Sequence, residues 1–161
     1  MSWRIVPGQG VGPLRFGMTQ AAVAAVPVAG RPSHVYRGSG ERLMEYRGLA
    51  VPVCEYLRGG LCRVIAGRHV AGLQLDGIDL FGTAPAKVLR ALEKRLGPPR
   101  LCQEQVCFSG AGLMLGGFYD AGDHRFFEPA VEYHDERSVT LYPPGPCGLP
   151  GEAEEEVVSF L

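Results

Sequence analysis

The sequence predicts an α+β fold made of two tandem repeats, each a helix followed by a three- to four-stranded antiparallel sheet, with the helices on one face. Three observations lead to this prediction. Glycine (23 residues) and proline (13 residues) are so frequent that turns must be many and regular elements short. A short pattern of glycine, phenylalanine, alanine and valine occurs twice. Each occurrence leads into a helical pattern and then into strand-like segments.

The length and composition are those of a folded chain. The 161 residues are 46% hydrophobic and 20% charged, which excludes a disordered chain, and the length suits one domain or two small fused units. We expect a first repeat over residues 1–68, a second repeat over residues 69–145 and an acidic tail over residues 146–161. Together they are expected to form one compact structural domain.

The repeated pattern lies in residues 12–23 and 77–88, where five residue pairs coincide. These pairs are Gly12 and Gly77, Phe16 and Phe81, Gly17 and Gly82, Ala21 and Ala86, and Val23 and Val88. Five matches can also arise by chance in a chain rich in these residues. The shared order of the elements that follow favours duplication.

The first repeat is expected to begin with a short helix. Thr19 can cap this helix, and Val23 and Val26 face inward. Strand patterns follow, and Gly59 and Gly60 supply the positive φ of a tight hairpin. The expected strands are residues 42–47, 51–57 and 61–66.

The second repeat is expected to hold a longer helix. Thr83 can cap it, and Pro85 falls in its first turn, where a missing N–H costs nothing. Its apolar stripe consists of Val88, Leu89, Leu92 and Leu96. A bridging strand is expected at residues 69–75, and further strands at residues 100–108, 113–119, 126–133 and 138–142. The apolar residues at the end of the tail can dock as a strand or a helical turn.

The sequence favours a cytoplasmic bacterial protein. Residues 1–8 lack the apolar core of a secretory signal, and no window approaches the roughly 18 apolar residues of a membrane span, so we expect no membrane association. Arginine outnumbers lysine by 14 to 2, a bias typical of a GC-rich genome. The cysteines show no CxxC spacing, which favours reduced thiols over a zinc site, and we expect neither metal nor cofactor. They are Cys54, Cys62, Cys102, Cys107 and Cys147.

Residues 10–19, Gly-Val-Gly-Pro-Leu-Arg-Phe-Gly-Met-Thr, carry a family resemblance. Together with the valine-containing helix that follows, they resemble the opening of the units in beta-lactamase inhibitory proteins and in small outer-membrane assembly lipoproteins. Similar openings occur in bacterial cytoplasmic immunity proteins, which neutralise secreted toxins. We expect neither a signal peptide with a lipobox cysteine nor paired cysteines in this chain, so the immunity proteins fit best. The resemblance implies a non-catalytic inhibitor that occludes the active site of a cognate toxin or effector.

Charge is divided unevenly along the chain. Residues 1–100 carry 14 basic and 6 acidic side chains, a net charge of +8, whereas residues 101–161 carry 2 basic and 11 acidic side chains, a net charge of −9. This polarity can steer a charged partner, although the two halves can also neutralise each other where they meet. A cationic toxin would favour an acidic surface with exposed aromatic residues. The candidate partner-binding residues are Asp120, Asp123, Glu128, Glu132, Asp135, Glu136, Phe118 and Tyr133.

Two alternative functions are open at the level of sequence. The basic first 100 residues could bind nucleic acid, but their arginines do not fall on one strand face and no recognised motif is present. A small metal-dependent hydrolase could use the region of His124 and His134, but no metal-ligand or nucleophile spacing accompanies these histidines. We therefore predict that the chain is not an enzyme and has no nucleic-acid partner. The oligomeric state is left open.

Overall fold

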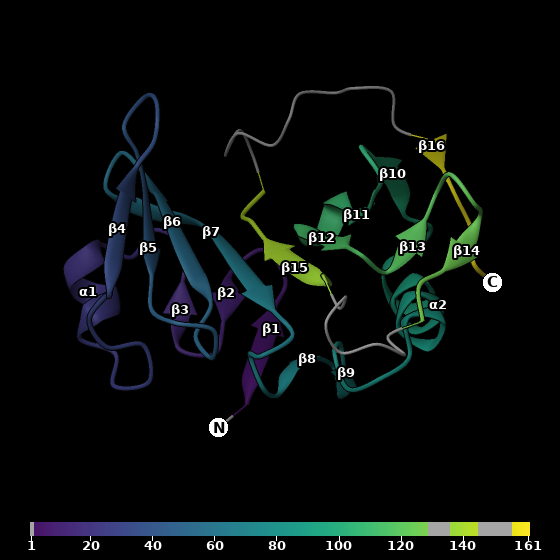
Figure 1. The fold of residues 1–161 in the computed structure, drawn as a ribbon, viewed down its shortest axis with the longest axis horizontal. Coiled ribbons are helices and arrows are strands. Elements are labelled where there is room, and N and C mark those ends of the chain that lie inside the picture. The colour runs from purple at the N-terminus through teal and green to yellow at the C-terminus, as the bar shows by residue number, and fades with distance from the viewer. Residues whose placement is uncertain (1, 129–135, 145–155) are drawn as a thin grey trace.

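The chain folds mainly into β-structure, and this overturns the predicted fold class. The computed structural model describes residues 2–128, 136–144 and 156–161, and strands make up 39% of them. A nine-stranded antiparallel sheet dominates, and the described residues contain two α-helices (Figure 1). The prediction of two repeats, each a helix followed by its own sheet, is therefore wrong. A single sheet crosses the molecule instead, because strands from the two halves of the sequence pair with each other.

The nine-stranded sheet has the strand order β16-β10-β11-β12-β15-β7-β6-β5-β4. The two halves of the sequence meet where β7 pairs with β15, with Val64 opposite Leu141 and Ala66 opposite Val139. All four of these side chains are buried, so the junction is part of the core. The strands in chain order are β4 (His34–Arg37), β5 (Arg42–Tyr46), β6 (Val53–Leu57), β7 (Gly60–Gly67), β10 (Arg100–Cys102), β11 (Gln105–Phe108), β12 (Leu113–Gly116), β15 (Ser138–Leu141) and β16 (Glu156–Val157).

A smaller sheet holds the N-terminal strand against the middle of the chain. Its order is β3-β2-β1-β8-β9, and β1 pairs in parallel with β8. Gly12, at φ 54°, lies against the ring of buried Trp3, where a side chain would not fit. The strands are β1 (Trp3–Val6), β2 (Gly10–Val11), β3 (Leu14–Arg15), β8 (Leu73–Leu75) and β9 (Ile78–Asp79), and a separate hairpin consists of β13 (Tyr119–Asp120) and β14 (Arg125–Phe126).

The first helix, α1 (Gln20–Ala24), begins where the sequence predicts. The side-chain oxygen of Thr19 accepts a hydrogen bond from the N–H of Ala22 (3.1 Å), and Val23 is buried. The helix is only five residues long, which is too short to cover a sheet face by itself. Its length is one reason why the molecule is mostly β.

The second helix, α2 (Pro85–Leu96), buries three of the four residues of the predicted stripe, and the fourth, Leu96, is partly buried. Val88, Leu89 and Leu92 are inaccessible to solvent, and Pro85 occupies the first turn. The expected cap by Thr83 is not formed, because the capping position is Ala84, which makes no side-chain hydrogen bond there. None of the described helices is long and apolar enough to cross a membrane.

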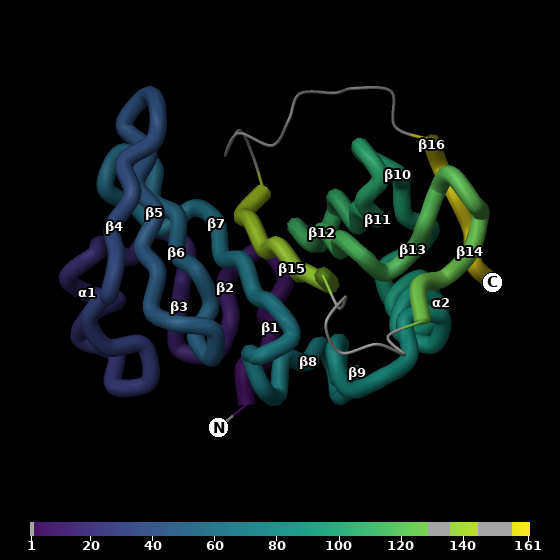
Figure 2. The backbone as a smooth tube through the Cα atoms, in the orientation of Figure 1, coloured from purple at the N-terminus to yellow at the C-terminus, as the bar shows by residue number. Residues whose placement is uncertain are grey.

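The C-terminal residues close the β10 end of the sheet. β16 pairs with β10, and the chain then returns to α2 (Figure 2). The buried carboxylate of Glu93 accepts hydrogen bonds from the Ser159 hydroxyl (2.6 Å) and the Phe160 N–H (2.7 Å), while Arg90 donates to the Phe160 carbonyl (3.0 Å). The Phe160 ring packs against the β13–β14 hairpin. Of the two expected ways of docking, the strand is present at Glu156–Val157, whereas Phe160 docks on α2 outside any strand.

Several expected strands are present with different ends. Residues 42–47, 51–57, 61–66 and 138–142 correspond closely to β5, β6, β7 and β15. Residues 100–108 form a hairpin instead of one strand, because Gln103 and Glu104 both adopt left-handed φ values (48° and 67°). Three other expected strands are shorter than predicted. Residues 69–75 contain β8, residues 113–119 contain β12 and the first residue of β13, and residues 126–133 contain the last residue of β14. Residues 129–133 lie outside the described residues.

Candidate functional site

The last strand of the large sheet, β4, is an exposed edge. All four of its residues are exposed, including Val35 (49%) and Tyr36 (55%), which are large hydrophobic side chains. β4 pairs with β5 on one side only, and within the described residues no strand pairs with its other side. An edge strand with exposed apolar side chains is a template on which another chain can pair.

The backbone of β4 presents free hydrogen-bonding groups along this edge. The N–H of Gly38 donates to the carbonyl of Arg42 (2.9 Å), so these two residues form a hydrogen-bonded pair. Such pairs alternate with non-hydrogen-bonded pairs in an antiparallel ladder. The N–H and C=O groups of Val35 and Arg37 therefore point away from β5 and toward the open side of the sheet.

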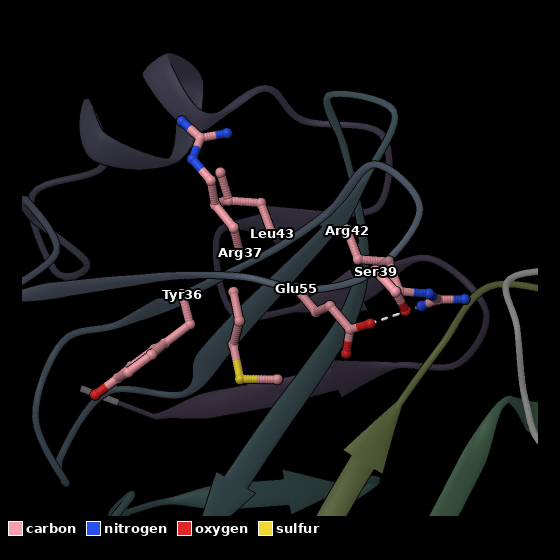
Figure 3. A pocket seen from close by; sticks show the side chains of 8 residues that line it. Tyr36, Arg37, Ser39, Arg42, Leu43 and Glu55 are labelled. Atoms are coloured by element: carbon pink, nitrogen blue, oxygen red, sulfur yellow. Dashed lines mark hydrogen bonds and ion pairs between the residues drawn. The ribbon is translucent and has the colours of Figure 1, made fainter.

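A pocket of about 250 Å³ lies at the end of β4, on the face toward which Tyr36 points (Figure 3). It is lined in part by Tyr36, Met44 and the ion pair between Arg42 and Glu55, whose Nη1 and Oε1 atoms are 2.7 Å apart. Glu55 is buried and is also 3.5 Å from Arg63. The pocket thus has an aromatic and thioether wall beside a charged wall.

A second pocket, of about 360 Å³, also adjoins the hairpin of β4 and β5. Arg37 borders both pockets, and its side chain points to the side of β4 opposite Tyr36 (Figure 3). Gln20 and Tyr56 also line this pocket, as do Glu41 and Arg58, which form an exposed ion pair (3.2 Å). The end of β4 is therefore flanked by two pockets, the first more apolar and the second more basic.

A buried polar cluster supports this hairpin from beneath. The carboxylate of Glu45 pairs with Arg47, accepts a hydrogen bond from Gln20 of α1 (2.8 Å) and accepts another from the Tyr56 hydroxyl (3.2 Å). The side chains of Glu45 and Arg47 are 2% and 1% exposed. Arg47 also donates to the carbonyl of Gly30 (3.0 Å), on the loop that leads to β4. These contacts tie α1, β5, β6 and that loop together.

Cys54 and Tyr56 lie within the same cluster and are protonated at neutral pH. Burial raises the pKa of the Cys54 thiol to about 11, although the positive charge of Arg47 partly offsets this effect. Burial also raises the pKa of the Tyr56 phenol above its ordinary value. A buried thiol with such a pKa is a poor nucleophile, so Cys54 has a packing role.

The surroundings of β4 are basic. Arg31 and Arg37 are exposed, and neither forms an ion pair with a described residue. The exposed carboxylate near this edge, Glu41, is paired with Arg58. An uncompensated positive potential at the edge attracts negatively charged partners.

The predicted acidic surface is only partly available to a partner. Asp120 accepts hydrogen bonds from the N–H groups of Gly122 and Asp123, which closes its own turn, and Arg125 lies 4.0 Å from Asp120 and 3.5 Å from Asp123. Phe118 is fully buried in the core and cannot reach a partner surface. Glu128 and Glu136 are exposed, whereas Glu132, Tyr133 and Asp135 lie outside the described residues.

The residues of the two alternative functions are also dispersed. His124 is an exposed turn residue at φ 51°, and His134 lies outside the described residues. The described part of the chain contains no group of three or more His, Cys, Asp or Glu side chains suited to a metal ion. Several basic side chains expected to serve nucleic-acid binding are paired with carboxylates. The pairs are Arg42 and Arg63 with Glu55, Arg47 with Glu45, Arg58 with Glu41, and Arg95 with Asp76.

Comparisons of the chain with protein-family models, curated proteins and solved structures found no match. The resemblance to immunity proteins therefore stays an expectation from the sequence. Sequence reasoning missed β4, although His34, Tyr36 and the β-branched Val35 are compatible with a strand. The available signal was this run directly after the Pro32-Ser33 turn residues and before the Gly38-Ser39-Gly40 loop.

Proposed function

We propose that this chain is a non-catalytic protein-binding inhibitor of the immunity type, which binds a cognate bacterial toxin or effector enzyme and covers its active site. The observation that carries the proposal is the exposed edge of β4, with its outward backbone groups at Val35 and Arg37 and its exposed Tyr36. Strand addition to such an edge is an established mode of protein recognition. The cytoplasm of the producing cell is the proposed site of action.

A rigid edge suits an inhibitor that does no chemistry. Glu45 and Arg47 are almost completely buried and join β5 to α1 and to the loop before β4, so the edge is held in one position before a partner arrives. Such preorganisation reduces the entropy lost on binding. The resemblance of residues 10–19 to immunity proteins supports the same function.

The test is capture of a partner from the producing cell followed by neutralisation of its toxicity. Wild-type chain and the variant Val35→Pro serve as baits. Proline removes an N–H that points away from β5, so the fold is expected to persist, and circular dichroism checks this. The captured protein is then expressed alone or with either bait. We expect growth arrest that the wild-type chain relieves and Val35→Pro does not.

A harmless captured protein would contradict the proposal, as would a toxin bound but not neutralised. If Val35→Pro fails to fold, Arg37→Glu provides the same test, because Arg37 is exposed and makes no ion pair with a described residue. Lys87→Glu is the matched control. It changes the net charge equally on the exposed side of α2, which lies on the opposite side of the molecule from β4 (Figure 1), and should neutralise as well as wild type.

A further inference from the structure

We infer that the segment bound at β4 is an extended acidic strand, which pairs its backbone with Val35 and Arg37 and presents a carboxylate to the Arg37 guanidinium. This inference rests on the proposed function, since it names the chemistry of the segment that the inhibitor would bind. It follows from the directions of the backbone groups, the charge of the edge and the two pockets that flank it.

The backbone sets the mode of binding. Val35 and Arg37 each direct one N–H and one C=O away from β5, which offers two donors and two acceptors spaced as in a β-ladder. A helix cannot satisfy such a row, because its own N–H and C=O groups are already paired. An extended segment can satisfy all four groups.

The side chains then set an alternating pattern for the bound strand. Successive residues of a strand point to opposite faces, so one face of the bound strand adjoins Tyr36 and the other adjoins Arg37. On the Tyr36 face, the pocket of about 250 Å³ with Met44 accepts an apolar side chain. On the Arg37 face, the pocket of about 360 Å³ accepts a carboxylate.

The charge of the edge selects an acidic partner over a second copy of this chain. Arg31 and Arg37 have no carboxylate partner among the described residues. Pairing β4 of one copy with β4 of another would bring four such guanidinium groups to one edge, and like charges facing each other across a ladder are destabilising. A strand carrying glutamate or aspartate replaces that repulsion with charge-assisted hydrogen bonds.

Two fluorescent peptides test the inference directly. One is an eight-residue peptide of alternating valine and glutamate, and the other replaces each glutamate with lysine. Anisotropy titration of the full chain should give at least about tenfold tighter binding of the glutamate peptide, since a charge-assisted hydrogen bond contributes roughly that factor. Binding should weaken as salt is added.

Variants separate the backbone from the charge. Val35→Pro should weaken the binding of the glutamate peptide by about tenfold or more, because it removes one donor and obstructs the edge. Val35→Thr keeps the N–H and should bind within about threefold of wild type. Arg37→Glu should remove the preference for the glutamate peptide, and the control Lys87→Glu should leave it unchanged.

Equal binding of the two peptides would overturn the inferred acidity, and unchanged binding to Val35→Pro would overturn the mode of pairing. Sedimentation velocity tests whether a second copy of the chain occupies the edge instead. A wild-type dimer that becomes a monomer in Val35→Pro would show this and would overturn the inference. The peptide titration uses no toxin. If the chain prefers the glutamate peptide but does not neutralise a toxin, the proposed function is overturned and the inferred acidic strand is not.

Discussion

The two ends of the nine-stranded sheet are completed in different ways. At the β10 end, the two residues of β16 pair with the edge, and Glu93 of α2 holds the chain beyond them through Ser159 and Phe160. At the β4 end, no described strand covers the edge, and support comes from beneath, through the buried pair of Glu45 and Arg47. One end is therefore covered by an additional strand, whereas the other is supported by a buried ion pair beneath it.

The comparison shows two ways in which the edge of a sheet can be protected, by a covering strand or by charge. Covering an edge takes little sequence, since a two-residue strand and one buried carboxylate do so at β10. Proteins protect the edges that they leave uncovered by charging them. Arg31 and Arg37 provide that charge at β4, and they leave the edge open to partners of opposite charge.

The largest expected effect is at the open end. Glu45→Ala leaves Arg47 buried without its carboxylate and removes the acceptor of Gln20 and Tyr56. Breaking a buried ion pair in this way costs about 3–5 kcal/mol. Urea denaturation should detect a loss of that size in the free energy of unfolding. The control is Arg95→Ala, whose exposed pair with Asp76 is worth at most about 1 kcal/mol. Equal losses in the two variants would mean that the cluster does not support the edge.

The covered end should respond less strongly but more locally. Glu93→Ala removes the acceptor of the Ser159 hydroxyl and the Phe160 N–H. Because Ser159 is exposed and its hydroxyl can bond to water instead, the loss should be about 2–3 kcal/mol, close to that of one hydrogen bond to a charged group. Hydrogen exchange of the β10 amides should become faster, and carboxypeptidase should remove the last residues more quickly. Glu93→Gln keeps one acceptor oxygen and should be intermediate. A variant with unchanged exchange at β10 would contradict the anchoring role of Glu93.

The smallest effect depends on pH and is confined to the open end. The pKa of Cys54 is about 11 in the folded chain, above the ordinary value of 9.0 for a thiol, so the unfolded state loses its proton first as pH rises. Its contribution to stability is complete below pH 9 and is lost as pH rises toward 11. About 1 kcal/mol should be lost by pH 10. Denaturation at pH 8 and pH 10 measures this loss. Cys54→Ala should reduce the difference, and an undiminished slope would assign it to other groups.

The elements that sequence could predict are those whose signals are local. The α2 stripe of Val88, Leu89 and Leu92 and the Thr19 cap depend on residues within one or two turns, and both are present. The pairing of β7 with β15 depends on residues from opposite halves of the chain, so no local pattern reports it. The two-repeat prediction failed at that point, because similar local patterns do not determine how sheets join.

The candidate site was missed for a related reason. The clustered charge of the acidic second half predicted a binding surface there. In the structure, however, Asp120 accepts hydrogen bonds from N–H groups of its own turn and lies beside Arg125. Phe118 was expected at a surface, yet Gly117, at φ 75°, redirects the chain and Phe118 is buried. The β4 edge has a modest sequence signal, and it becomes a site only because β4 is last in the strand order.

The junction of β7 with β15 also constrains how the protein is made. β7 ends at Gly67 and β15 begins at Ser138, so a ribosome adds about 70 residues between the two strands. At the usual rate of about 5–20 residues per second, roughly 4–14 s pass between the synthesis of β7 and the synthesis of β15. During synthesis the nascent sheet of β4 to β7 therefore has two open edges, and the buried side chains of Val64 and Ala66 lack their cross-strand contacts until Leu141 and Val139 emerge. The second half of the chain thus completes the first, and truncated translation products should be prone to aggregate.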